Sequence, residues 1–245
     1  MDRRSPRDGY PEIGRDEGYH VLADERGRAA VRELSDVRPD TVTESDLTDA
    51  VTHQVYGERN VPWEDRKNIK NSLHNTYLGR LQEMGAADYD RPAGDVTPEP
   101  GVVVLRRHLD YADRIVDEEL DMDTLFTALK EPRRRHTLRY LRDVKDPASV
   151  SDIAGTVTDI ESDGPAFHRK SVHTTLQQNH IPRLDEAGIV DFDPPGGPVT
   201  GRTVACLDPF LADSPDPDPA DEYLDPLAGR HPMYRLAGQI IDRWL

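Results

Sequence analysis

The sequence predicts a mainly α-helical chain with small β-hairpins, an α+β fold in which one unit occurs twice in tandem. Residues 66–82 and 164–184 contain no Asp or Glu, although 47 of the 245 residues are acidic. At that composition, about three and about four acids are expected in them. The two stretches also align at a constant separation of 103 positions. The identical pairs include Arg66/Arg169, Lys67/Lys170, Leu73/Leu176, Arg80/Arg183, Leu81/Leu184 and Gly85/Gly188.

Both acid-free stretches have the apolar spacing of a helix that is buried on one side. The apolar or packed positions recur every four residues, which places them on one helix face. The opposite face then carries uncharged and basic hydrogen-bonding groups. The recurring positions are Ile69, Leu73, Tyr77 and Leu81 in the first stretch, and Val172, Leu176, His180 and Leu184 in the second.

In the first repeat, assigned to residues 18–108, two further helices precede the acid-free one. Residues 1–17 are polar and broken by Pro and Gly, which indicates a flexible lead. A short helical turn and an amphipathic helix follow and end before Pro39. The next helix is capped by Thr43 or Ser45 and stops near Gly57.

A hairpin is predicted after the acid-free helix, which begins after Pro62 and Trp63. Its strands are assigned to residues 86–90 and 102–106, around a turn rich in Pro and Gly. Residues 109–121 have apolar positions at helical spacing and predict a connecting helix.

The second repeat, assigned to residues 122–210, follows the same order. Its start matches the first repeat at a separation of 107, as in Leu22/Leu129 and Arg28/Arg135. Ser149 or Ser151 caps the second helix, and strands are expected at residues 189–193 and 202–207. Three helices followed by a two-stranded hairpin is the order of a winged helix-turn-helix, so the chain is predicted to contain a tandem pair of such domains.

The C-terminal part has a different composition. Residues 211–226 are an Asp/Pro linker expected to stay extended. Residues 227–245 predict an amphipathic helix, whose apolar face would contact a partner subunit or its own domain. For a homodimer, the contacts would come from Leu236, Ile240 and Trp244.

Composition bounds the class of protein. The formal net charge of −16 argues against a general affinity for nucleic acid. However, five lysines stand against 26 arginines, and Asp outnumbers Glu. This combination resembles proteins of salt-adapted haloarchaea, whose surfaces are acidic whatever they bind. The places without acid are therefore more informative than the total.

The second repeat also carries the sequence pattern of a known family. Residues 125–141 (LFTALKEPRRRHTLRYL) and 179–193 (NHIPRLDEAGIVDFD) resemble an uncharacterised winged-helix domain family abundant in haloarchaea, over about residues 122–207. That family combines an Arg-rich first helix, a His-x-Pro-x-Leu segment and an Ala-Gly-hydrophobic-acidic strand. The first repeat departs from it, with Gly79 for Pro182 and Tyr77 for His180. The resemblance implies the fold, and transcription regulation is what such domains usually suggest.

The acid-free faces are the candidate DNA-binding surface. Arg and Lys bind phosphates or guanine edges, and Asn and Gln can bond adenine. A solvated face that happens to lack acids is the alternative. The candidate residues are Arg66, Lys67, Lys70, Asn71, His74 and Asn75 in the first repeat, and Arg169, Lys170, His173, Thr174, Gln177 and Gln178 in the second.

Three further arginines have two interpretations each. Arg133 and Arg134, in the Arg-rich helix, can bind phosphates beside the groove or pair with acids of the neighbouring repeat. Arg202 can enter the minor groove from the hairpin tip, although an arginine that closes a hairpin is commoner.

No catalytic or metal site is predicted. His173 and His180 are about 10 Å apart along a helix, too far to share an ion, so His180 is interpreted as a packed, hydrogen-bonded core residue. Motifs for nucleophilic catalysis, phosphate loops and dinucleotide binding are absent. The single Cys206 excludes an internal disulfide. We therefore expect neither an enzyme nor a cofactor.

The function expected from the sequence is that of a transcriptional regulator that binds double-stranded DNA through two winged-helix modules. The alternative is a protein-interaction or dimerisation module that keeps the winged fold without binding DNA. Because no 18-residue apolar run and no signal peptide occur, a cytoplasmic protein without a membrane partner is expected.

Overall fold

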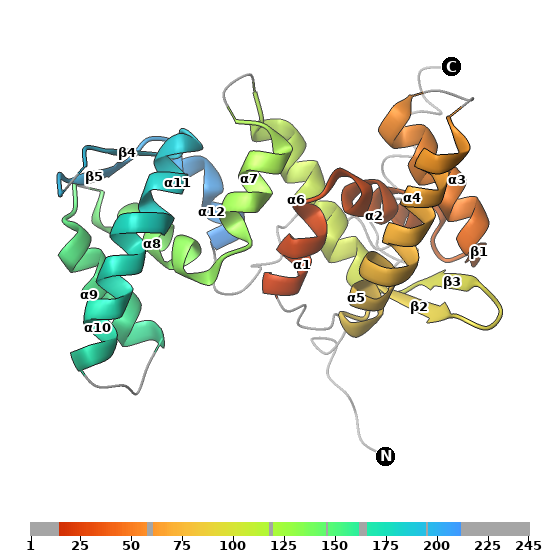
Figure 1. The fold of residues 1–245 in the computed structure, drawn as a ribbon, viewed down its shortest axis with the longest axis horizontal. Helices are drawn as coiled ribbons and strands as arrows, with labels where there is room; N and C mark the ends of the chain where they lie inside the picture. Colours follow the sequence, from red (N-terminus) through yellow and green to blue (C-terminus); the bar gives the residue numbers. More distant parts are fainter. Residues whose placement is uncertain are drawn as a thin grey trace, which may run out of the picture. The chain divides into compact units, whose positions relative to one another are not determined.

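The structure of the chain, a computed structural model, describes residues 15–57, 61–117, 120–145, 147–161, 166–194 and 196–211. This part is mainly helical, with one three-stranded and one two-stranded antiparallel sheet (Figure 1). Beyond Leu211, the predicted linker and C-terminal helix, including Leu236, Ile240 and Trp244, lie outside the described residues.

The first repeat contains an opening helix (α1), three longer helical segments, a hairpin and a closing helix. The last of the three longer segments, residues 63–83, is called the third helix; it is continuous but includes a π-helical turn. The elements are α1 (Arg15–Leu22), α2 (Glu25–Val37), β1 (Val42–Thr43), α3 (Glu44–Tyr56), α4 (Trp63–Ser72), the π-turn Leu73–Tyr77, α5 (Leu78–Glu83), β2 (Ala87–Asp90), β3 (Asp95–Pro98) and α6 (Gly101–Ile115). Helix α1 includes the last three residues of the predicted flexible lead, which is therefore too long.

The second repeat has the same order of elements, with a shorter closing segment. Its third helix, residues 166–186, again includes a π-turn. The elements are α7 (Met122–Leu129), α8 (Pro132–Val144), α9 (Val150–Glu161), α10 (Ala166–Thr175), the π-turn Leu176–His180, α11 (Ile181–Glu186), β4 (Val190–Phe192), β5 (Val199–Gly201), the 3-10 turn Val204–Leu207 and α12 (Asp208–Leu211). The tandem repetition predicted from the sequence is thus visible in the fold.

Local sequence signals set the helix ends where they were predicted. The Thr43 hydroxyl accepts a bond from the Asp46 amide at 3.1 Å and caps α3. The helix stops at Gly57, which has φ 66°, a conformation open to glycine at little cost. In the second repeat, the Ser149 hydroxyl accepts from the Asp152 amide at the same distance.

Both third helices have their π-turn at the same place, starting at Leu73 and at Leu176. Gly79 and Pro182 both weaken a helix, yet each helix continues for several residues beyond them. Because only one copy contains proline, the proline does not cause the turn. Such turns are found disproportionately at functional sites.

The second strand of each hairpin lies earlier in the chain than predicted. Residues 102–106 were expected to form a strand but begin α6, and residues 204–207 form a 3-10 turn. The Val run starting at Val102 suggested a strand because β-branched residues favour one. In the fold, Val102, Leu105 and Leu109 lie on one buried helix face, and this burial outweighs the local preference. The predicted connecting helix therefore starts at Gly101.

The sheets of the two repeats pair in the same register. In the first, the order is β1-β3-β2, and Val96 of β3 pairs with Val42 and with Tyr89. In the second, Val199 pairs with Phe192, while the third strand is reduced to a single bridge from Ala148 to Val199. Buried apolar side chains of both repeats join in one core.

Candidate nucleic-acid interface

The third helix of each repeat is buried along the predicted apolar stripe. Ile69, Leu73 and Leu81 are fully buried, and Tyr77 nearly so. In the other copy, Val172, Leu176 and Leu184 are fully buried. This packing against α3 and α9 fixes which side of each helix faces outward.

The outward side carries the same kinds of residue in both copies. Three positions spaced four residues apart are exposed in each helix, and we call them the outer stripe. In both repeats the first residue of the outer stripe is a lysine, and the third residue, two helical turns later, has a carboxamide side chain. The outer stripe consists of Lys67, Asn71 and Asn75 in the first repeat, and of Lys170, Thr174 and Gln178 in the second. Further exposed positions on these helices are uncharged at Asn68 and Thr76 and at Ser171 and Asn179, and basic at Lys70 and Arg169.

Trp63 provides an aromatic surface at the start of the first outer stripe. Its side chain is 68% exposed, and the Lys67 ammonium lies 4.8 Å from the ring centroid. A cation over an aromatic face is attracted by the ring quadrupole. Lys70 is also exposed, and its counterpart His173 is half-buried.

The arginines that open the two stretches lie against the preceding helix. Arg66 bonds to Asp49 and, at 3.2 Å, to Ser45, both on α3. The hydrogen bond from Arg66 lowers the pKa of Asp49, and the same contact raises the pKa of Arg66. Arg169 reaches the Ser151 carbonyl at 3.3 Å. In this structure, both arginines join the second and third helices.

His74 takes part in a network that links three elements. Its Nδ1 atom is 2.8 Å from the Tyr89 hydroxyl on β2 and 3.2 Å from a carboxylate oxygen of Glu44 on α3. The Tyr89 hydroxyl donates to the other Glu44 oxygen at 2.9 Å. Burial and this carboxylate raise the pKa of Tyr89 to about 12. The network ties the third helix of the first repeat to its hairpin. At the equivalent position, Gln177 is half-buried.

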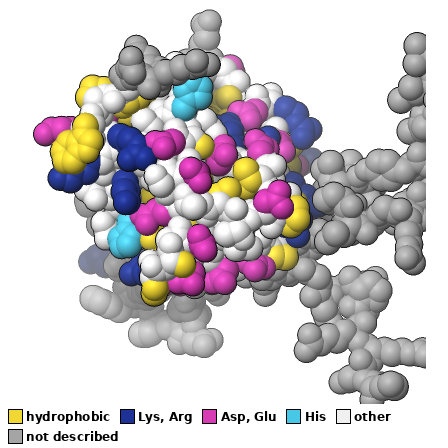
Figure 2. Space-filling model, turned by 90° about the vertical axis from the view of Figure 1, so that its right-hand side faces the viewer, with side chains coloured by type: hydrophobic (Ala, Val, Ile, Leu, Met, Phe, Trp, Pro, Cys, Tyr) yellow, Lys and Arg dark blue, Asp and Glu magenta, His cyan; other side chains and the backbone are white. Residues whose placement is uncertain are grey.

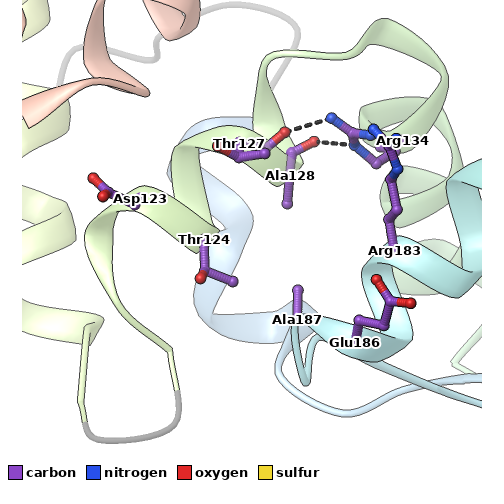
Figure 3. A pocket seen from close by; sticks show the side chains of 8 residues that line it. All are labelled: Asp123, Thr124, Thr127, Ala128, Arg134, Arg183, Glu186 and Ala187. Atoms are coloured by element: carbon purple, nitrogen blue, oxygen red, sulfur yellow. Dashed lines mark hydrogen bonds between the residues drawn. The ribbon is translucent and has the colours of Figure 1, made fainter.

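The structure corrects the surface role predicted for Arg134. Its side chain is 1% exposed, and its guanidinium donates to the Ala128 carbonyl at 2.8 Å and to the Thr127 carbonyl (Figure 3). It lines one side of a pocket of about 400 Å³ between α7 and α11, opposite Ala187. Buried in this way, Arg134 closes the end of α7 and is not available to a phosphate.

Arg133 and Arg202 are held by carboxylates. Arg133 forms a two-pronged ion pair with Glu161 and also donates to Thr175 at 2.9 Å. Arg202 pairs with Asp191 on the adjacent strand. Arg202 therefore closes the hairpin, which is the alternative that the sequence offered to a contact with the minor groove. For Arg133, the partner acid belongs to the same repeat and not to the neighbouring one.

The charge distribution of this face is mixed. Figure 2 shows the side on which α3 and the β2–β3 hairpin lie in Figure 1. Acidic side chains are scattered among small groups of basic ones, and much of the surface is uncharged. On this side of the first repeat, the basic side chains therefore form small groups and no broad positive field.

His180 is packed in the core, as predicted, but its hydrogen bonding differs. It is 9% exposed, and its buried Nδ1 atom has no hydrogen-bond partner. Burial, followed by the charges of Arg134 and Arg133, lowers its pKa.

In the part of the chain that the structure describes, no three His, Cys, Asp or Glu residues are grouped to hold a metal ion. Within the same residues, no helix has the length and apolar character needed to cross a membrane.

A comparison with protein families matches both repeats. The family model described as "Domain of unknown function (DUF7344)" matches residues 19–97 and again residues 126–200. The chain belongs to this family. The two DUF7344 segments start 107 residues apart and end 103 apart, the same separations at which the sequence repeats. No curated protein and no solved structure matches the chain.

Proposed function

We propose that this DUF7344 protein binds double-stranded DNA as a transcriptional regulator and that each repeat is a winged helix-turn-helix module. Each repeat has a helix pair, α3 with α4 or α9 with α10, followed by a hairpin. The third helix would enter the major groove, whose width admits an α-helix. The hairpin next to it would act as the wing.

The repeated outer stripe is the observation that carries this proposal. Six exposed positions, three in each copy, bring an ammonium followed by uncharged hydrogen-bonding side chains outward, and acids are excluded from residues 66–82 and 164–184. Lysine can contact phosphate or guanine, and a carboxamide can bond adenine through two atoms. A face kept free of carboxylates avoids repulsion by a polyanion.

The ion pairs between arginines and carboxylates determine how strongly the affinity for DNA should depend on salt. Of the cations predicted to contact DNA, Arg66, Arg133 and Arg202 are paired with carboxylates. Lys67, Lys70, Lys170 and Arg169 are exposed. If these four cations neutralise phosphates, the logarithm of the binding constant should fall with the logarithm of salt concentration with a slope of about −4. That is a weak dependence, suited to concentrated salt.

Binding of the full-length protein to labelled duplexes tests the proposal. Fluorescence anisotropy in potassium chloride would compare the wild type with Lys67→Glu/Lys170→Glu. The matched control is Arg114→Glu/Lys145→Glu, which changes the formal charge equally at exposed positions outside both third helices. We expect the first variant to lose at least about tenfold in affinity, since two attractions to phosphate are replaced by two repulsions, and the control to change little.

The outcome also separates the alternative function. If the wild type binds no duplex from a random-sequence library above the level of the denatured protein, the DNA proposal is wrong. The outer stripe would then serve a protein partner, as in an interaction module that keeps the fold. Equal losses in both variants would mean that net charge alone, and not the outer stripe, controls binding.

A further inference from the structure

The two repeats contact each other through equivalent elements. Helices α1 and α7 each open a repeat, and they pack together. Tyr19 and Phe126 occupy equivalent positions, 107 residues apart, and their ring centroids are 6.2 Å from each other. A position that touches its own equivalent lies on the axis of a two-fold arrangement.

Two reciprocal ion pairs support the same symmetry. Arg28 of the first repeat bonds to Asp123 of the second, and Arg135 of the second bonds to Asp16 of the first. Both arginines and both aspartates are again equivalent pairs at the separation of 107. A two-fold interface requires that if one residue contacts another, the reverse contact also occurs. A head-to-tail arrangement would contain only one of the two pairs.

Each arginine also has the same anchor within its own repeat. Arg28 donates to the carbonyl of Leu22 at 2.9 Å, and Arg135 donates to that of Leu129 at 2.6 Å. These carbonyls are the last of α1 and of α7, which have no partner within the helix. One guanidinium therefore closes its own helix and reaches across to the other repeat.

The arginines of the interface and the rings of Tyr19 and Phe210 are buried, while the two aspartates are exposed. Arg28 and Arg135 are each 6% exposed. The Tyr19 hydroxyl donates to the Phe210 carbonyl at 3.1 Å, and the His108 and Phe210 rings stack at 5.7 Å. These two rings belong to α6 and α12, the segments that follow the two hairpins. The closing segments thus meet each other as the opening helices do.

We propose that the DNA target of this protein is dyad-symmetric, with two half-sites in inverted orientation. This inference rests on the proposed function. An approximate two-fold axis between the repeats relates residues 63–83 to residues 166–186, and half-sites mirror the symmetry of the protein that reads them. The two outer stripes differ at Asn71/Thr174 and Asn75/Gln178, so the half-sites are similar but not identical.

Selection of duplexes from a random-sequence library by the full-length protein supplies the half-sites. Affinity would then be compared on probes that carry the same two half-sites in direct and in both inverted orientations, at several spacings. We expect one inverted orientation to bind at least about tenfold more tightly than the best direct repeat, because only that probe engages both helices at once. Equal or tighter binding of a direct repeat would overturn the symmetric arrangement while leaving DNA binding established.

Interface variants provide an independent readout on the same probes. In Asp16→Arg/Asp123→Arg, each arginine faces another arginine, whereas Asp16→Glu/Asp123→Glu keeps both ion pairs and leaves Arg28 and Arg135 in place. We expect the first variant to lose its preference for a probe with two half-sites over a probe with one, and the second variant to retain it. Retention by both would overturn the role of these pairs in orienting the repeats. If no duplex is selected at all, the proposed function itself fails.

Discussion

Gly27 allows the closest approach between α1 and α2. A Cβ atom at this position would lie 2.1 Å from the Val21 carbonyl oxygen. Carbon atoms contact carbonyl oxygens at about 3.3 Å or more, so Gly27→Ala must separate the helices by about 1.2 Å. The obstacle is backbone, which cannot rotate away as a side chain can. Since α1 also carries Tyr19 of the repeat interface, its displacement affects more than one contact.

The expected effect of Gly27→Ala is a clear loss of stability. Overpacking costs about 1–3 kcal/mol, and contact with backbone places this site at the upper end. Alanine recovers about 1 kcal/mol from its higher helix propensity. The net loss is about 2 kcal/mol, or about 4–8 °C in Tm for a chain of this size. Thermal unfolding followed by circular dichroism in concentrated potassium chloride measures it.

Gly79→Ala is the matched control. Gly79 also lies inside a helix, but its added Cβ would meet only the Arg91 side chain, at an ordinary 3.7 Å. This substitution should raise stability by up to about 1 kcal/mol through helix propensity alone. If both substitutions shift Tm in the same direction, the contact between α1 and Gly27 does not determine the effect of Gly27→Ala, and the prediction is wrong.

Two further effects on stability are expected. Because burial lowers the pKa of His180, the unfolded chain binds the proton first as pH falls through about 6.5, and stability present above that pH is lost. The decrease in Tm between pH 7 and pH 5 should thus be smaller in His180→Phe, and equal decreases would contradict this. Arg133→Met should cost about 1–2 kcal/mol in urea unfolding, because Glu161 loses a charged partner. The double variant Arg133→Met/Glu161→Met should lose less stability than Arg133→Met. If Arg133→Met left stability unchanged but weakened DNA binding, Arg133 would contact DNA rather than stabilise the fold.

Periodicity and capping residues were enough to predict the helical framework. The apolar stripe starting at Ile69 and the caps at Thr43 and Ser149 depend on neighbours within a few residues, so the sequence contains them. The start of α6 at Gly101 was missed because its Val run favours a strand locally. Only the packing of Leu105 and Leu109 in the core shows the helical period.

The exposure of the candidate residues was predicted less evenly than the fold. The exposure of the outer stripe was predicted, since helix periodicity separates Lys67 or Lys170 from the buried face. The buried contacts of Arg134 were not predictable, because the carbonyls that bind it become neighbours only when α7 packs on α8. Its equivalent in the first repeat is Gly27, so even the internal comparison gave no signal. The pairing of Arg28 with Asp123, 95 residues away, depends wholly on the tertiary fold.

The two kinds of basic residue serve different purposes in this acidic chain. A guanidinium carries five donors in a planar fork and can satisfy a carbonyl and a carboxylate together, as Arg28 and Arg135 do at the repeat interface. An ammonium on a flexible stem suits an exposed position, and Lys67 and Lys170 hold equivalent places on the two outer stripes. With most arginines committed to internal contacts, DNA recognition would rest on few charges and on side chains such as Asn75 and Gln178. Specificity would then be retained in salt concentrations that suppress general phosphate binding.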